Sequence, residues 1–168
     1  MIGYLLAIPV LLLAMMLQTA VVSRLPLVFG TADLLLLVLA AWALQQRVPT
    51  WWYWALVTIG LTAYISAMPL TAIVATYLGV VIIARFILSR VWRSPLLSML
   101  TVVFIGTMIY HGLTYFIRQF NGVPLDLMES LNLVVLPSLL LNMLIALPVY
   151  AVMKDLADRI YPPDEMDV

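Results

Sequence analysis

The sequence predicts an all-α integral membrane protein with six transmembrane helices in one bundle. Of its 168 residues, 65% are hydrophobic and 10% are charged, and the mean hydropathy is +1.14. A span needs about 20 mainly apolar residues to cross roughly 30 Å of hydrocarbon, so this length accommodates about six spans. Six apolar runs, separated by charged residues, proline and glycine, fill nearly the whole chain. Little length remains for an extramembrane domain.

The six predicted helices cover residues 3–22, 31–46, 51–67, 70–88, 96–119 and 131–153. They form a single transmembrane domain over residues 1–160, and a short acidic cytoplasmic tail follows at 161–168. The first run lacks a basic start and is long for a signal peptide, so we expect it to be retained as a span. The third and fourth helices share one apolar stretch. We divide it at Pro69, because proline lacks a backbone donor and disfavours helical geometry at the preceding residue.

Two of these helices carry recognisable start signals. Thr31 is the predicted N-cap of the second helix, and it places Asp33 in the first turn, where the helix dipole favours a carboxylate. The third helix begins with Thr50–Trp54, which reads TWWYW and contains four aromatic residues. Aromatic side chains concentrate where a span enters the membrane, so we expect these four to anchor the chain in the interface.

The distribution of basic residues predicts that both termini are cytoplasmic. With that orientation the inner side carries Arg47, Arg85, Arg90, Arg93, Lys154 and Arg159, whereas the outer side carries only Arg24 and Arg118. This asymmetry follows the positive-inside rule. Three of the inner residues, Arg85, Arg90 and Arg93, cluster at the end of the fourth span. They are expected to set topology and attract anionic headgroups, and the alternative is a docking patch for a cytoplasmic protein.

Polar residues and prolines interrupt the last helix. The stretch Leu136–Tyr150 reads LPSLLLNMLIALPVY. Ser138 and Asn142 are four residues apart, so they share one helix face and can hydrogen-bond a neighbouring helix. Pro137 and Pro148 leave backbone groups that must be satisfied inside the protein. We interpret this helix as kinked and joined to its neighbours by hydrogen bonds. Alternatively, Asn142 lines a substrate cavity or contacts the transmembrane helix of another protein.

The sequence contains no pattern typical of an enzyme or a metal site. A polar stripe of Thr107, His111, Thr114 and Arg118 should face the bundle interior or a partner. His111 is the only histidine, and we interpret it as structural, with a ligand or proton-relay role as the alternative. Asp33 stands apart from Asp126 and Glu129, cysteine is absent and the net charge is zero. We therefore expect no catalytic set, no metal or other cofactor, and no nucleic-acid partner.

Two segments of the chain form a recognisable pattern when they are taken together. In Leu17–Leu37, LQTAVVSRLPLVFGTADLLLL, Gln18 ends the first span, a short turn contains Pro26, and a small residue and Asp33 open a Leu-rich second span. The second segment is Leu136–Tyr150, with its Leu-Pro-Ser start, central Asn142 and closing Pro148 and Tyr150. Together the two segments resemble the bacterial rod shape-determining MreD family. One departure from the family concerns residues 61–72, LTAYISAMPLTA. The family commonly has an aspartate there before a Pro-Leu-Gly turn, whereas neither the aspartate nor the glycine is present in this chain.

The resemblance implies a fold similar to the S components of energy-coupling factor transporters. It also implies a non-enzymatic scaffold for peptidoglycan synthesis and cell shape in the bacterial cytoplasmic membrane. The expected partner is the bitopic MreC and, through it, MreB, a class B transpeptidase and RodA of the elongation machinery (elongasome). Candidate fold or partner-contact positions are Gln18, Arg24, Pro26, Asp33, Pro137, Ser138, Asn142 and Tyr150. Gly3 and Ala7 add one small-residue pair for helix packing.

The alternative function is that of an S-component-like protein. Such a protein would bind a small molecule, such as a vitamin, in an outward cavity beneath the outer loops. An intramembrane enzyme is a more distant alternative, because the sequence contains no recognisable catalytic set.

Overall fold

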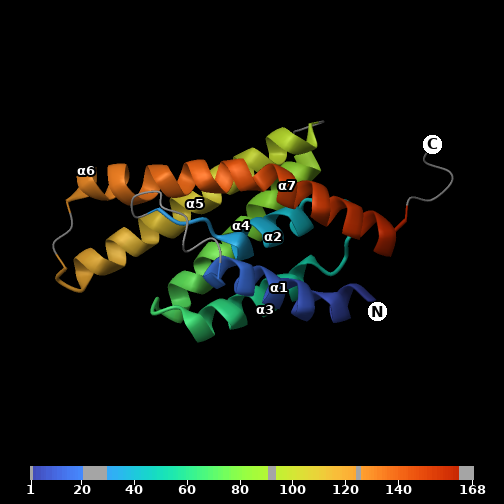
Figure 1. Ribbon diagram of the computed structural model, residues 1–168, viewed down its shortest axis with the longest axis horizontal. Helices are drawn as coiled ribbons and strands as arrows, with labels where there is room; N and C mark the ends of the chain where they lie inside the picture. The colour runs from blue at the N-terminus through green and yellow to red at the C-terminus, as the bar shows by residue number, and fades with distance from the viewer. Residues whose placement is uncertain (1, 21–29, 91–93, 124–125, 163–168) are drawn as a thin grey trace.

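The computed structural model describes residues 2–20, 30–90, 94–123 and 126–162, and within them the chain is helical without strands (Figure 1). The helices are α1 (Ile2–Ala20), α2 (Leu34–Ala43), α3 (Trp51–Ile65), α4 (Leu70–Arg90), α5 (Pro95–Phe120), α6 (Leu127–Ser130), η2 (Leu131–Val135) and α7 (Leu136–Ile160). Consecutive long helices run in opposite directions, so the start of α1 and the end of α7 lie at the same end of the molecule (Figure 1). The predicted all-α class is confirmed.

Four helical segments of the described chain are long and apolar enough to cross a membrane: α1, α4, α5 and the continuous 34-residue rod formed by α6, η2 and α7. The other two helices are shorter. At 1.5 Å per residue, α2 is about 15 Å long and α3 about 22 Å, less than the roughly 30 Å of a hydrocarbon core. The sequence predicts the second helix over residues 31–46, whereas the structure restricts it to Leu34–Ala43.

The short helix α2 is the core of the bundle. All ten of its residues are buried, and it contacts α1, α3, α4, α5 and α7. Its sequence, LLLLVLAAWA, is apolar on every side, which is typical of a helix enclosed by other helices. The longer helices therefore have a common surface to pack against, and their outward sides remain apolar and exposed.

Helix α1 is two-sided. Gly3, Ala7, Leu11 and Ala14 face the bundle, whereas large residues such as Leu5 and Leu13 are exposed. The carbonyl of Gly3 accepts a hydrogen bond from Trp54 Nε1 at 2.9 Å. The small-residue pair Gly3 and Ala7 therefore packs α1 onto its own bundle.

The aromatic residues at the start of α3 have two different roles. Trp54 is fully buried and stacks on Trp42, with ring centroids 4.1 Å apart. Its predicted role as an interfacial anchor is wrong, because helical spacing turns this ring toward the core. Trp52 is exposed, and its ring contacts those of Tyr4 and Tyr53 edge-on. Trp52 is therefore placed as an interfacial aromatic residue should be, whereas Trp54 is a core residue.

The last helical rod is longer than the predicted helix over residues 131–153, since it begins at Leu127 and ends at Ile160. Asp126 caps its start, accepting a hydrogen bond from the backbone of Glu129 at 2.8 Å. A π-helical turn precedes Pro137, and within it the Leu136 N–H donates to the Leu131 carbonyl. Such a turn redistributes backbone hydrogen bonds next to a residue that has no N–H. The rod thus continues through Pro137 as a helix.

Candidate functional site

The first turn of α2 lies inside the bundle, so its free N–H groups need partners within the protein. The Asp33 carboxylate accepts a hydrogen bond from Leu36 N at 3.0 Å and so caps the helix. From α1, Gln18 Oε1 accepts from Leu34 N at 2.9 Å and from Leu35 N at 3.4 Å. The prediction of Thr31 as N-cap is wrong. Asp33 takes that position because residues 30–33 are not helical and its own backbone is extended.

The segment before α2 is held against α7. Thr31 N donates to Ser138 Oγ at 3.0 Å, and Asp33 N donates to Asn142 Oδ1 at 2.8 Å. These acceptors share one face of α7 because they are one helical turn apart. A serine and an asparagine inside an apolar helix therefore serve as hydrogen-bond acceptors for an extended backbone.

Gly30 allows this segment to lie close to α7. A Cβ atom at Gly30 would lie 2.5 Å from Pro137 Cβ and 2.7 Å from Ser138 N. Real Cβ atoms do not approach other heavy atoms so closely, so a larger residue would push the extended segment away from its hydrogen bonds. Pro137 is thus a packing partner of the segment as well as an interruption of α7.

Two further hydrogen bonds connect the start of α2 to α4 and α5. The hydroxyl of Tyr77 donates to Asp33 Oδ2 at 3.0 Å, and Asn142 Nδ2 donates to Thr107 Oγ1 at 3.0 Å. Tyr77, Thr107 and Asn142 are each no more than 1% exposed. We name this network the polar junction; its side chains are Gln18, Asp33, Tyr77, Thr107, Ser138 and Asn142. It connects α1, α2, α4, α5 and α7.

A small cavity adjoins the polar junction, with a volume of about 40 Å³. Its lining residues are Gln18, Thr31, Ala32, Asp33, Leu36, Thr107, Tyr110, His111 and Asn142. This space suits one or a few water molecules, whereas ligand pockets usually measure about 300–1,000 Å³. His111 is half-buried at its edge, with its ring edge-on to that of Tyr110 at 5.2 Å. The described part of the chain contains no group of three or more potential metal-ligating His, Cys, Asp or Glu residues.

The structure brings together most of the residues that the sequence marked. Gln18, Asp33, Pro137, Ser138 and Asn142 meet around the start of α2. Tyr150 is also buried but lies at the opposite end of α2, beside Gln45. Arg24 and Pro26 lie outside the described residues.

The predicted arginine cluster is only partly described. Arg85 Nη1 donates to the carbonyls of Ala43 and Gln45, at 3.3 and 3.2 Å, and so caps the last turn of α2. Its guanidinium also lies 5.7 Å from the ring centre of Trp51. This arginine therefore serves the fold. Arg93 and the side chain of Arg90 lie outside the described residues.

Tyr77 is the member of the polar junction that the sequence did not reveal. It lies within a long apolar run, where a tyrosine resembles any other lipid-facing or packed aromatic residue. Its partner Asp33 is 44 residues away in the sequence. The sequence offers one general signal for this pair. A buried tyrosine hydroxyl usually needs a hydrogen-bond acceptor, and Asp33 supplies a carboxylate in the same apolar bundle.

Comparisons with protein-family models, curated proteins and solved structures find no match to this chain. Fold and site together define the class of protein. Its described residues form an all-helical membrane protein, in which four helical segments are long and apolar enough to cross a membrane, one short helix is enclosed and polar side chains form an internal network.

Proposed function

We propose that this protein is a non-enzymatic membrane scaffold of the cell-wall elongation machinery, of the kind the MreD family represents. In this proposal the bundle docks the single transmembrane helix of MreC in the cytoplasmic membrane. Through MreC it holds MreB, the class B transpeptidase and RodA at one membrane site and so maintains rod shape. Its six helices cross the membrane six times in an S-component-like arrangement, with α2 and α3 completed by their flanking loops.

The observation that carries this proposal is that the two segments resembling MreD meet in the polar junction. Gln18 and Asp33 belong to the first segment, and Ser138 and Asn142 belong to the second. Residues 107 and 109 positions apart are joined there by direct hydrogen bonds. The pattern behind the resemblance therefore corresponds to one structural unit, as expected if it describes a shared fold.

The internal use of these polar groups also favours docking over transport of a metabolite. Ser138 and Asn142 are directed at the protein's own backbone, and the adjoining cavity of about 40 Å³ is too small for a vitamin. A partner helix would instead pack on the exposed apolar sides of the outer helices, by van der Waals contact. Leu13 on α1, Phe86 on α4 and Leu144 on α7 exemplify these sides.

Site-specific photo-crosslinking in native membranes tests the proposal. A photoreactive residue at Leu13, Phe86 or Leu144 reports on three lipid-facing sides, and Leu37, which is 0% exposed, is the matched control. We expect MreC to be crosslinked from at least one exposed position and not from Leu37. Affinity purification should recover MreC together with the chain.

Two results would contradict the scaffold proposal. One is the absence of MreC from every crosslinked and purified sample. The other is recovery of a bound vitamin together with a transporter coupling protein, which would establish the S-component alternative.

A further inference from the structure

The small cavity beside the polar junction is unusually polar for the inside of an apolar bundle. Seven of its nine lining residues carry polar side chains, and its volume is about 40 Å³. Thr107 and Asn142 lie at its buried side, Asp33 and His111 are half-buried, and Thr31 is exposed. The cavity is therefore small, polar and reachable from outside the protein.

The cavity lies deep in the bundle. Tyr77, the donor to Asp33, stands seven residues after the start of α4. Thr107 stands 13 residues before the end of α5. At 1.5 Å per residue these positions are about 10 and 20 Å from the helix ends. An ionised carboxylate at such a depth needs a compensating positive charge.

The Asp33 carboxylate has hydrogen-bond donors but no counter-charge in the described part of the chain. Its oxygens accept from Leu36 N and from the Tyr77 hydroxyl, each at 3.0 Å. No described lysine or arginine forms a salt bridge with it, and Arg118 is exposed about three turns beyond Thr107 on α5. A carboxylate has about four lone-pair sites, so two donors leave room for a cation.

The non-helical segment before α2 supplies a further oxygen. Ala32 is 1% exposed and lines the cavity. Its carbonyl precedes the helical ladder, and no N–H or O–H group of the described residues donates to it. A buried carbonyl normally has a partner. A cation in the cavity would satisfy this carbonyl and the Asp33 carboxylate together.

We propose that this cavity binds a sodium ion. Asp33 supplies the negative charge, the Ala32 carbonyl and Thr107 Oγ1 supply neutral oxygens, and water completes the coordination shell. Thr107 Oγ1 accepts one hydrogen bond, from Asn142 Nδ2, and a hydroxyl oxygen has a second lone pair. Non-helical backbone carbonyls inside a membrane protein are a typical setting for sodium.

Charge and size select sodium among the common cations. One carboxylate balances a monovalent ion, whereas calcium takes six to eight oxygens, often from several carboxylates. A space of about 40 Å³ suits sodium better than the larger potassium ion. Neutral oxygens provide most of the ligands, so the site needs no cluster of His, Cys, Asp or Glu. This proposal does not depend on the docking of MreC.

Thermal unfolding of the purified full-length chain in micelles tests the site. The unfolding midpoint is measured at one pH and one ionic strength in sodium, potassium or choline chloride. We expect about 150 mM sodium to raise the midpoint by roughly 3 °C or more over choline, as mass action gives for a millimolar site. Potassium should raise it by less.

Variants at two of the proposed ligands locate the ion. Asp33→Asn should abolish the difference between sodium and choline. Each variant is compared with itself in the two salts, so a loss of basal stability does not affect the result. Thr107→Val should reduce the difference, whereas Thr107→Ser keeps the hydroxyl and should preserve it. The two Thr107 variants test the site even if Asp33→Asn does not fold.

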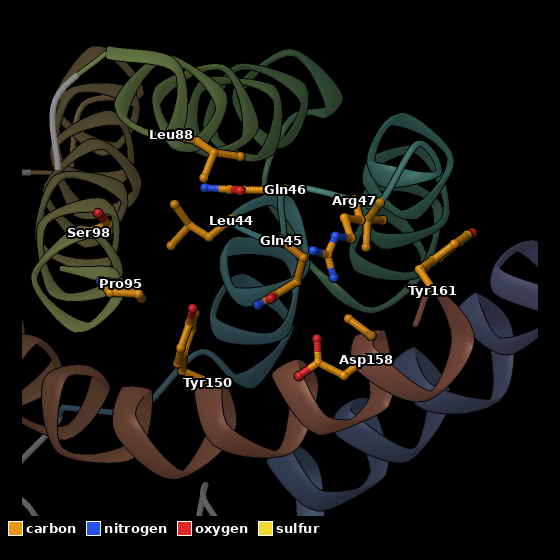
Figure 2. A pocket seen from close by; sticks show the side chains of 12 residues that line it. Leu44, Gln45, Gln46, Arg47, Leu88, Pro95, Ser98, Tyr150, Asp158 and Tyr161 are labelled. Carbon is orange, nitrogen blue, oxygen red and sulfur yellow. The ribbon is translucent and has the colours of Figure 1, made fainter. Parts of the chain in front are cut away.

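The larger cavity of the bundle provides a matched control. It measures about 260 Å³, lies beyond the opposite end of α2 and shares no lining residue with the small cavity (Figure 2). The Asp158 carboxylate projects from α7 on one side of it (Figure 2). Asp158→Asn therefore removes a carboxylate from this cavity and should leave the sodium effect unchanged.

Three results would overturn the proposal. The first is an equal midpoint in sodium and choline for the unchanged chain; stabilisation by acid alone would then place a proton, and not sodium, at Asp33 or His111. The second is a sodium effect that persists in full in Asp33→Asn or in Thr107→Val. The third is loss of the sodium effect in Asp158→Asn, which would place the ion at the larger cavity.

Discussion

At the residue scale, Asn142 is a buried amide that makes hydrogen bonds in two directions. Its carbonyl oxygen accepts from Asp33 N, and its amide donates to Thr107 Oγ1, so one side chain joins three helical elements. Inside a membrane protein an unsatisfied backbone N–H has no water to replace a lost partner. The amide in an otherwise apolar helix is explained by this dual contact.

Replacing Asn142 with leucine should therefore destabilise the protein. The Asp33 N–H would lose its acceptor and Thr107 its donor, at a cost of roughly 1–3 kcal/mol. Unfolding of the purified chain in micelles, followed by circular dichroism, measures the loss. Asn132→Leu is the matched control, because Asn132 is an exposed amide on the same rod. Equal stability of the two variants would refute the role assigned to Asn142.

The two glycines Gly30 and Gly60 should respond in opposite ways to alanine. At Gly30 the new methyl group would overlap Pro137 and Ser138, so we expect a loss of about 1–3 kcal/mol. Gly60 lies on an exposed side of α3, where a methyl group would meet nothing within 4 Å, and there alanine should be neutral or stabilise the helix by up to about 1 kcal/mol. The thermal unfolding midpoints of the two variants, each compared with that of the unchanged chain, test both expectations. If Gly30→Ala were tolerated, the close approach of the extended segment to α7 would be wrong.

At the scale of elements, the bundle is organised by one enclosed helix and several two-sided ones. The sides of α2 are equivalent in burial, whereas α1 presents one side to the bundle and the other outward. Apolar composition alone does not separate these cases, because lipid accepts leucine as readily as a protein core does. Matched substitutions on the two sides of a single helix can separate them.

Leu11 and Leu13 on α1 provide such a pair. Leu11 is 0% exposed and Leu13 is 58% exposed. Leu11→Ala should leave an internal cavity and cost about 2 kcal/mol or more, whereas lipid or detergent can fill the space left by Leu13→Ala. Unfolding curves in identical micelles provide the comparison. A larger loss at Leu13 than at Leu11 would mean that α1 is rotated relative to the structure described above.

At the scale of the whole molecule, the alternation of helix direction places the start of α1 and the end of α7 at the same end (Figure 1). The excess of basic residues at that end favours a cytoplasmic location for it. Asp126, the cap of α6, lies at the other end of the last rod, 33 positions before Arg159. We therefore expect Asp126 and Arg159 to lie on opposite sides of the membrane.

Labelling of single cysteines in this cysteine-free chain tests the orientation. Asp126→Cys should react with a membrane-impermeant maleimide in intact cells, and Arg159→Cys should react only after the membrane is opened. Both positions are exposed in the structure, so accessibility within the protein is matched. The reverse labelling pattern would overturn the assignment based on the positive-inside rule.

The sequence by itself determined the all-α class, the approximate positions of the helices and which polar residues stand out. These features depend on local hydropathy and on helix-breaking residues, which need no knowledge of distant contacts. Its boundaries were least accurate at the last helix, predicted over residues 131–153, because the rod extends from Leu127 to Ile160, past the charged residues that end the apolar run.

Only the tertiary structure decided what those polar residues contact. Thr31 meets Ser138 across 107 positions and Asp33 meets Asn142 across 109, and an extended segment between two helices makes both contacts. Helical periodicity places Ser138 and Asn142 on one face but does not say which element covers that face. The burial of α2 and of Trp54 is decided in the same way, because in an apolar chain only packing distinguishes a core residue from a lipid-facing one.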